Sequence, residues 1–233
     1  MGLAGLGLTA RAAVPLFPGV IRAPAYFTEL WNQRVNSTEP KSDLISMLAH
    51  GEATRNMPPM EYLGNILLLI VGGNDTTRNS ITGGLLALSQ NPAEEAKLRA
   101  DPSLIPNMVS EIIRWQTPLA YMRRTAVADF ELSGKTIKKG DKVVMWYVSG
   151  NRDESVHAEP DALRIERPKV RQHLSFGAGI HRCVGDRLAE LQLQVLWREM
   201  LKRNLRPEIV GQPVRHYSNF LRGIRSLPVI LRA

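Results

Sequence analysis

The stretch His173-Leu-Ser-Phe-Gly-Ala-Gly-Ile-His-Arg-Cys-Val-Gly185 contains the only cysteine of this 233-residue chain and surrounds it with glycines. Glycine lets a backbone approach a flat ligand closely and adopt positive φ angles. Backbone amides in such a loop can donate hydrogen bonds to a sulfur and so tune its electron donation. A helical pattern follows Cys183, and the N-terminus of a helix favours an anion. The stretch therefore predicts a loop that presents a thiolate as a ligand.

Other interpretations of this cysteine are weaker. A lone cysteine is more often a small buried apolar residue, but the glycines around Cys183 argue against that. A zinc site formed by His173, His181 and Cys183 lacks a fourth ligand and the usual spacing. One cysteine cannot form an intramolecular disulfide, so the fold does not depend on oxidation, and we expect a cytoplasmic protein.

The pattern Phe-Gly-x-Gly-x-His-x-Cys-x-Gly over residues 176–185 resembles the haem-binding signature of the bacterial cytochromes P-450. The resemblance implies that the cofactor is haem b and that Cys183 is the ligand to its iron. It also implies that five neighbours contact the cofactor: Phe176, Gly177, Gly179, Ile180 and His181. Four stretches resemble one branch, the soluble terminal hydroxylases of medium-chain alkanes and fatty acids: residues 50–56, 72–80, 139–153 and 173–197.

Glu111 and Arg114 lie three residues apart, on one face of a predicted helix. Taken alone, such a pair is a routine surface ion pair worth a few tenths of a kcal/mol. In the resembled family the pair is joined by an arginine that precedes the cysteine loop, and Arg167 fits that position. The resemblance implies a structural role, in which the three residues hold the loop so that the haem can seat.

The segment Gly72-Gly-Asn-Asp-Thr-Thr77 lies within a long predicted helix. Each glycine disfavours a helix by about 1 kcal/mol relative to alanine, so the pair needs a reason. One reason is close helix packing, and another is a local widening that frees backbone groups to bind water and dioxygen. The resemblance places Gly73 at the cofactor. It makes Asp75 and Thr76 the catalytic acid–alcohol pair that relays protons.

The resemblance also identifies residues at the edge of the cofactor and around the substrate. Arg124, His173 and His181 match positions that hold the haem propionates through charge-assisted hydrogen bonds. The expected substrate contacts are mostly apolar: Ile70, Gly72, Leu119, Ala120, Met122 and Phe220. The implied reaction is the insertion of one oxygen atom from dioxygen into a C–H bond of an apolar chain.

The sequence contains no flavin or iron–sulfur motif, so the resemblance implies that a ferredoxin and its reductase supply the electrons. Arg182, Arg187 and Lys202 would suit an acidic ferredoxin. The net charge of +8 is also compatible with a nucleic acid. No basic motif interleaved with aromatic residues supports that partner, and we expect none. The apolar runs are too short to span a bilayer, so we expect no membrane span.

The patterning predicts a mainly α fold with a minor β-sheet, namely the C-terminal haem-binding portion of the P-450 fold. We expect helices over residues 26–35, 44–50, 59–90, 93–100 and 105–115, and after Cys183, where Val184, Leu188, Leu191 and Val195 recur at helical spacing. We expect strands over residues 124–132, 135–137 and 142–148, an irregular segment over 151–171, and a hairpin over 214–231.

The resemblance covers residues 25–233, and residues 1–24 resemble nothing in the family, which marks them as foreign or misread sequence. The family's N-terminal half has no counterpart in the chain, so we expect the chain alone to aggregate with sub-stoichiometric haem. The alternative to a working monooxygenase is a truncated, non-catalytic haem-binding remnant.

Overall fold

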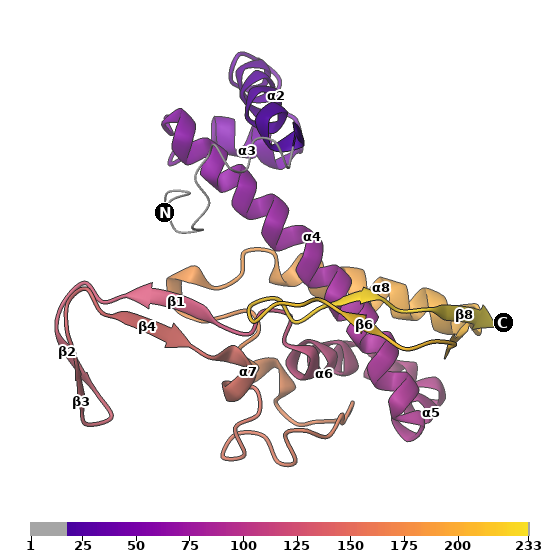
Figure 1. The fold of residues 1–233 in the computed structure, drawn as a ribbon. Coiled ribbons are helices and arrows are strands. Elements are labelled where there is room, and N and C mark those ends of the chain that lie inside the picture. Colours follow the sequence, from indigo (N-terminus) through magenta and orange to yellow (C-terminus); the bar gives the residue numbers. More distant parts are fainter. Residues whose placement is uncertain (1–17, 233) are drawn as a thin grey trace. The chain divides into compact units, whose positions relative to one another are not determined.

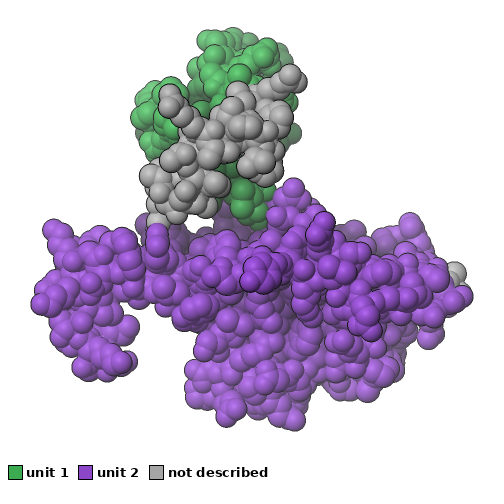
Figure 2. Space-filling view, viewed as in Figure 1, with its two compact units in different colours: residues 1–72 green, residues 73–233 purple. Residues whose placement is uncertain are grey.

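A computed structural model describes the backbone of residues 18–232 and the side chains of residues 23–232. The chain divides into two compact units, residues 1–72 and 73–233 (Figure 2). The expectation that residues 1–24 are foreign to the fold falls mainly on residues 1–17, which lie outside the described residues. Residues 18–24 already belong to a helix.

Over residues 18–72 the first unit contains two helices and the start of a third: α2 (Pro18–Val35), α3 (Leu44–His50) and α4 (Pro59–Gln90) (Figure 1). Asp43 caps α3, because its carboxylate accepts a hydrogen bond from the Ser46 N–H at 2.8 Å. The other oxygen of Asp43 accepts from Arg34 on α2 at 2.9 Å. The rings of Trp31 and Tyr62 lie 4.3 Å apart and join α2 to α4.

Helix α4 has the predicted length and begins with Pro59. Proline lacks a backbone N–H, and it is tolerated here because the first residue of a helix has no helical acceptor for that group. It remains α-helical across residues 72–77, so the predicted local widening is wrong for this structure. A cost of about 1 kcal/mol for each glycine is too small to open a helix that is hydrogen-bonded cooperatively on both sides.

The second unit has an α-helical core. Its helical elements after α4 are α5 (Pro92–Ala100), η2 (Pro102–Leu104), α6 (Ile105–Gln116), α7 (Tyr147–Gly150), η3 (Val170–Gln172), η4 (Gly179–His181) and α8 (Asp186–Lys202). Helix α6 lies at the centre, with Met108, Val109 and Ile112 fully buried. Leu98 of α5 and Leu193 of α8 belong to the same core, so α6 is the element around which the unit packs.

One face of α8 is apolar and exposed. The buried face carries Leu193, Trp197 and Met200. Three of the side chains predicted to share one face lie on the other side and are largely exposed: Leu188 (61%), Leu191 (52%) and Val195 (47%). The fourth, Val184 (88% exposed), precedes the helix, which begins at Asp186. The helical spacing was predicted correctly, but these residues are not part of the core.

Four two-stranded antiparallel sheets lie in the described part of the chain. They pair β1 (Met122–Thr125) with β4 (Lys142–Met145), β2 (Phe130–Leu132) with β3 (Lys135–Ile137), β5 (Arg206–Ile209) with β8 (Val229–Arg232), and β6 (Val214–Arg215) with β7 (Ile224–Ser226). The β2–β3 hairpin extends beyond the end of the β1–β4 ribbon (Figure 1). Ser133 and Gly134 at its tip have positive φ angles, which suits the predicted tight turn.

Three strand predictions are corrected. The strand predicted over residues 124–132 is divided between β1 and β2, which have different partners. The strand predicted over residues 142–148 ends at Met145, because Tyr147 begins α7. The tail is not one hairpin, because β7 pairs with β6 whereas β8 pairs with β5. Pro228 separates β7 from β8, and proline lacks the N–H that a continuous ladder requires.

The fold is mainly helical with small sheets, as predicted. Among the described residues, no helix has both the length and the apolarity needed to cross a bilayer.

Candidate functional site

The Cys183 loop closes on itself. The backbone N–H of Cys183 donates to the carbonyl of Phe176 at 2.8 Å. Gly177 and Gly179 have φ angles of 69° and 70°, in the left-handed region that glycine adopts without strain. A Cβ added to Gly177 would lie 3.0 Å from the hydroxyl oxygen of Tyr147, so this glycine also allows the loop to pack on α7. Helix α8 begins at Asp186, shortly after the cysteine.

The surface around the thiol is open and carries large apolar side chains beside the polar His181 and Arg182. Cys183 itself is exposed, and Ile180 and Val184 on either side of it are 96% and 88% exposed. A Cβ added to Gly179 would meet no heavy atom within 4 Å in the described part of the chain. Large apolar side chains gain free energy when they leave water, so this surface fits a large, flat, apolar ligand whose metal the sulfur can bind.

The three residues predicted to hold propionates have different environments. His173 is only 4% exposed, and its ring centroid lies 5.2 Å from that of Phe176. Its Nδ1 has no hydrogen-bond partner among the described residues. Burial, reinforced by the charge of Arg182, lowers the pKa of His173 to about 4, so the ring is neutral at pH 7. By contrast, His181 is exposed in η4, and Arg124 is half-buried on β1.

Glu111, Arg114 and Arg167 form one buried cluster. The Nε of Arg114 lies 2.7 Å from Glu111, and the Nε of Arg167 lies 3.0 Å from the same carboxylate. Side-chain exposure is 0% for Glu111 and Arg114 and 3% for Arg167, so both guanidinium groups are removed from water. Their remaining N–H groups donate to backbone carbonyls of residues 151–162. The structure thus brings together all three residues that the sequence placed in this role.

Asn151 connects this cluster to the cysteine loop, and the sequence did not reveal it. Its carbonyl accepts from Arg114 Nη1 at 2.7 Å. Its side-chain Oδ1 accepts from the Leu174 N–H at 2.6 Å, and its Nδ2 donates to the Ser175 hydroxyl at 2.8 Å. The Ser175 hydroxyl donates in turn to the carbonyl of Ile113 on α6. Asparagine in an irregular segment is common in turns, so no sequence signal marks this link.

The two glycine pairs of α4 differ in their surroundings. Cβ atoms added to Gly83 and Gly84 would lie 2.5 Å from Gln116 and 2.9 Å from Ile112, so this pair allows close packing on α6. At Gly72 and Gly73 an added Cβ would have no heavy atom within 4 Å in the region that the structure describes. Close helix packing therefore explains the second pair but not the first.

The predicted catalytic pair follows Gly73 on α4. Asp75 and Thr76 are both half-buried. The Asp75 carboxylate accepts from Arg78 Nη2 at 2.6 Å, one helical turn away. The carbonyl of Thr76 accepts from the Ser80 hydroxyl at 2.9 Å. Asp75 is thus held by an ion pair within its own helix.

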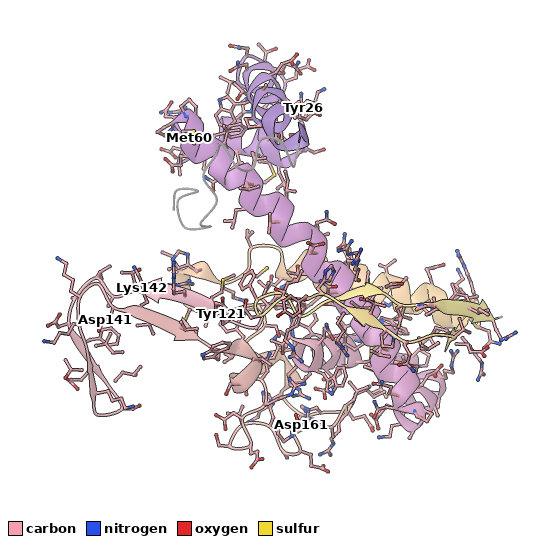
Figure 3. The ribbon with its side chains drawn as sticks, viewed as in Figure 1. Tyr26, Met60, Tyr121, Asp141, Lys142 and Asp161 are labelled. Atoms are coloured by element: carbon pink, nitrogen blue, oxygen red, sulfur yellow. The ribbon has the colours of Figure 1, made fainter. Side chains whose placement is uncertain are left out.

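Several predicted substrate contacts lie together. The Ala120 N–H donates to the carbonyl of Phe220 at 2.8 Å, and Leu119 forms a β-bridge with Leu221. Tyr121, labelled in Figure 3, lies just before β1, and its ring centroid is 5.4 Å from that of Phe220. Met122 follows at the start of β1, half-buried. Ile70 and Gly72 belong to the other unit and are exposed on α4.

The zinc alternative gains no support. His173 is buried whereas His181 and Cys183 are exposed. Within the described residues, no group of three or more histidine, cysteine or acidic side chains is placed to hold a metal ion.

The model of the Cytochrome P450 family matches residues 26–206, and this match supports haem binding among the interpretations of the Cys183 loop. The chain belongs to the cytochrome P450 family. This P450 chain is 43% identical over 204 residues to linalool 8-monooxygenase from Pseudomonas putida, which covers 87% of the chain and 50% of that relative. It is 41% identical over 211 residues to the methyl-branched lipid omega-hydroxylase of Mycobacterium tuberculosis, covering 88% and 48%.

Solved structures confirm the predicted fold class. Cytochrome P450-153 from Novosphingobium aromaticivorans superposes with a TM-score of 0.89 at 51% identity, over 98% of this chain and 57% of that one. The P450 from Sphingomonas sp. PAMC 26605 gives the same score and identity over 97% and 56%. The chain therefore spans about half the length of the relatives it matches. Membership of the family implies haem b as the cofactor.

Proposed function

We propose that this P450 chain carries the haem-thiolate centre of a monooxygenase that inserts one oxygen atom from dioxygen into a C–H bond. The observation that carries the proposal is the exposed thiol of Cys183, in a glycine loop bordered by exposed apolar side chains. Thiolate-ligated haem supplies dioxygen activation, because the sulfur donates electron density that favours O–O cleavage.

The neighbours of the thiol have separate roles in this proposal. Phe176, Gly177, Gly179 and Ile180 form the loop surface against the cofactor, and Gly73 faces it from α4. Arg124 and His181, which carry accessible polar groups, hold the propionates. His173 is buried and neutral, so a propionate contact there requires the ligand to reach its unpartnered Nδ1.

Asp75 and Thr76 deliver protons in the proposed reaction. The Thr76 hydroxyl orders the proton path, and the Asp75 carboxylate exchanges protons with solvent. Arg78 holds that carboxylate at 2.6 Å, so Asp75 must leave Arg78 before it can turn toward the active centre. The ion pair is more than 40% exposed on both sides, and breaking such a pair costs little.

We propose a medium-chain alkane or fatty acid as the substrate, hydroxylated at its terminus. The contacts proposed for it, Leu119, Ala120, Met122 and Phe220, are all apolar, which suits a hydrocarbon chain. The names of two relatives state oxidation of linalool in one protein and omega-hydroxylation of a methyl-branched lipid in the other.

A ferredoxin with its reductase is the proposed electron donor. The basic residues predicted to attract it are partly neutralised within the chain: Arg182 pairs with Asp186 at 2.7 Å, and Arg187 lies 3.6 Å from Glu190. Lys202 ends α8. Electrostatic attraction would therefore come from the overall positive charge as well as from these three residues.

The test is the absorption spectrum of the ferrous–CO complex. The haem-loaded protein should show the strongly red-shifted Soret band of thiolate ligation, and Cys183→His should abolish that shift, because imidazole donates less charge than thiolate. Val184→Ala serves as the control and should retain the band. An unchanged spectrum in Cys183→His would contradict the ligand assignment. Haem binding without the band in the parent protein would favour the non-catalytic remnant.

A further inference from the structure

The C-terminal tail lies directly against one side chain of α4. Asn79 is fully buried, and its Oδ1 accepts a hydrogen bond from the Ile224 N–H at 3.2 Å. A Cβ added to Gly223 would lie 2.6 Å from both terminal atoms of the Asn79 amide. Since real Cβ atoms do not approach this closely, the residue at position 223 must be glycine while Asn79 keeps its position. In Figure 1 the tail, in yellow, crosses α4.

The same tail segment is also held by the end of α6 and the residues that follow it. Gln116, at the end of α6, donates to the carbonyl of Arg222 at 2.7 Å. The Arg222 N–H donates to the carbonyl of Pro118 at 2.8 Å, and the Phe220 carbonyl accepts from Ala120 at 2.8 Å. Residues 220–222 are thus fixed to residues 116–120, and residues 223–224 are fixed to α4. Both groups of contacts lie within the second unit.

Asn79 also lies next to the segment proposed to deliver protons. It follows Thr76 by three residues on α4, and residues three apart share one face of a helix. The tail contact is therefore made on the same face of α4 as Thr76. Phe220 precedes Gly223 by three residues, so Asn79 can act on Phe220 only through the tail backbone that joins its own contact at residues 223–224 to the contacts of residues 220–222.

We propose that Asn79 is a positioning residue that, through Gly223 and Ile224, sets where Phe220 meets the substrate and hence which carbon is hydroxylated. This inference rests on the proposed monooxygenase function. Asn79 touches neither substrate nor cofactor in this role. It acts through the tail backbone. Its buried Nδ2 has no hydrogen-bond partner among the described residues, so Oδ1 is the atom that makes the contact.

The experiment compares Asn79→Ala, Gly223→Ala and the double variant with the parent protein. An alanine at position 223 should force the Asn79 amide away and break its hydrogen bond to the Ile224 N–H. Both single substitutions therefore disrupt the same contact. Gly84→Ala is the matched control, because its added Cβ would lie 2.9 Å from Ile112 in the core and would not contact the tail. The readouts are the free energy of unfolding, the dissociation constant for dodecanoic acid from the haem absorption shift, and the distribution of hydroxylated positions.

Each single variant should weaken dodecanoic acid binding by on the order of tenfold and spread hydroxylation over more positions, because small displacements misalign the reacting carbon. The double variant should be close to the single variants, so that the effects on unfolding and binding are strongly non-additive. Gly84→Ala should lower stability and leave the dissociation constant and product distribution unchanged.

Three results would overturn the proposal: additive effects in the double variant, an unchanged product distribution, or an equal change in Gly84→Ala, which would indicate general loosening. A parent protein without the thiolate band would overturn the proposed function instead. Non-additive unfolding in that case would still establish the Asn79–Gly223 contact, so the two failures are distinguishable.

Discussion

At the scale of single residues, Glu111 has the largest predicted effect on stability. Its carboxylate is the partner of two buried guanidinium groups, those of Arg114 and Arg167. Glu111→Gln should lower the free energy of unfolding by about 3–5 kcal/mol, because two buried positive charges lose their counter-charge. Glu199→Gln, which breaks an exposed pair with Arg203 on α8, should cost about 1 kcal/mol or less. Urea unfolding followed by circular dichroism compares them, and equal losses would contradict the argument.

His173 makes stability depend on pH. Its folded pKa of about 4 lies below the ordinary value of 6.5, so the unfolded chain binds a proton that the folded chain does not. Stability should therefore fall as the pH drops from about 6.5 to 4, by about 3 kcal/mol in total. His157, whose pKa is lowered by burial and by Arg114, adds to the same slope.

Urea midpoints measured between pH 7 and pH 4 test this dependence, at roughly half-unit steps across the window in which the proton uptake occurs. His173→Leu should flatten most of the slope and leave the part that His157 contributes. A slope that stays the same in this variant would show that other groups, mainly carboxylates, cause it.

Local contacts could be predicted where they depend on short spacings. The glycine loop around Cys183 and the Glu111–Arg114 pair are local patterns, and the structure places them as the sequence implied. Asn151 and Asn79 could not be predicted, because they bond to backbone groups 23 and 145 residues away. Backbone partners are available at every position, so the sequence contains no pattern that selects one.

At the scale of elements, the two glycine pairs of α4 should respond oppositely to alanine. Gly73→Ala should stabilise the chain without haem by up to about 1 kcal/mol, since alanine favours a helix and the added Cβ meets no neighbour in the described part of the chain. Gly84→Ala should destabilise it by about 1–3 kcal/mol through a clash with Ile112. Thermal melting measures both. Gly73→Ala should also lower the haem content of the purified protein, because Gly73 is proposed to face the cofactor from α4.

Helices were predicted better than strands for a physical reason. A helix has a repeat of 3.6 residues that its own sequence reveals, and caps such as Asp43 mark its ends. A strand of three or four residues is defined by the strand with which it pairs. The partner of β5 is β8, which lies about twenty residues further along the chain. The sequence pattern therefore predicts one hairpin for the tail, whereas β7 pairs with β6 and β8, after Pro228, pairs with β5.

At the scale of the whole molecule, exposed apolar side chains set the expected behaviour in solution. Leu188, Leu191 and Val195 form an exposed stripe along α8, and Ile180 and Val184, which precede the helix, are exposed as well. Each such side chain gains about 1.5–3 kcal/mol when it is buried, so contacts between molecules are favourable. The 233-residue chain should therefore self-associate as its concentration rises and bind a hydrophobic dye.

Light scattering and dye fluorescence measure this behaviour. The double variant Leu188→Lys/Leu191→Lys should reduce both signals, because charge breaks the stripe. Val127→Lys changes an 88% exposed side chain outside α8 and should leave both signals unchanged. A parent chain that stays monomeric at high concentration would contradict the prediction.

The position of Cys183 has a practical consequence for counting occupied molecules. The chain has one sulfhydryl, and it is exposed at the surface of the second unit. A maleimide reagent can therefore attach at a single place, without competing reactions elsewhere in the chain. A sulfur engaged with iron is protected from alkylation, whereas a vacant one reacts. The ratio of unlabelled to labelled chains in the mass spectrum thus reports the fraction of molecules in which the cofactor is seated.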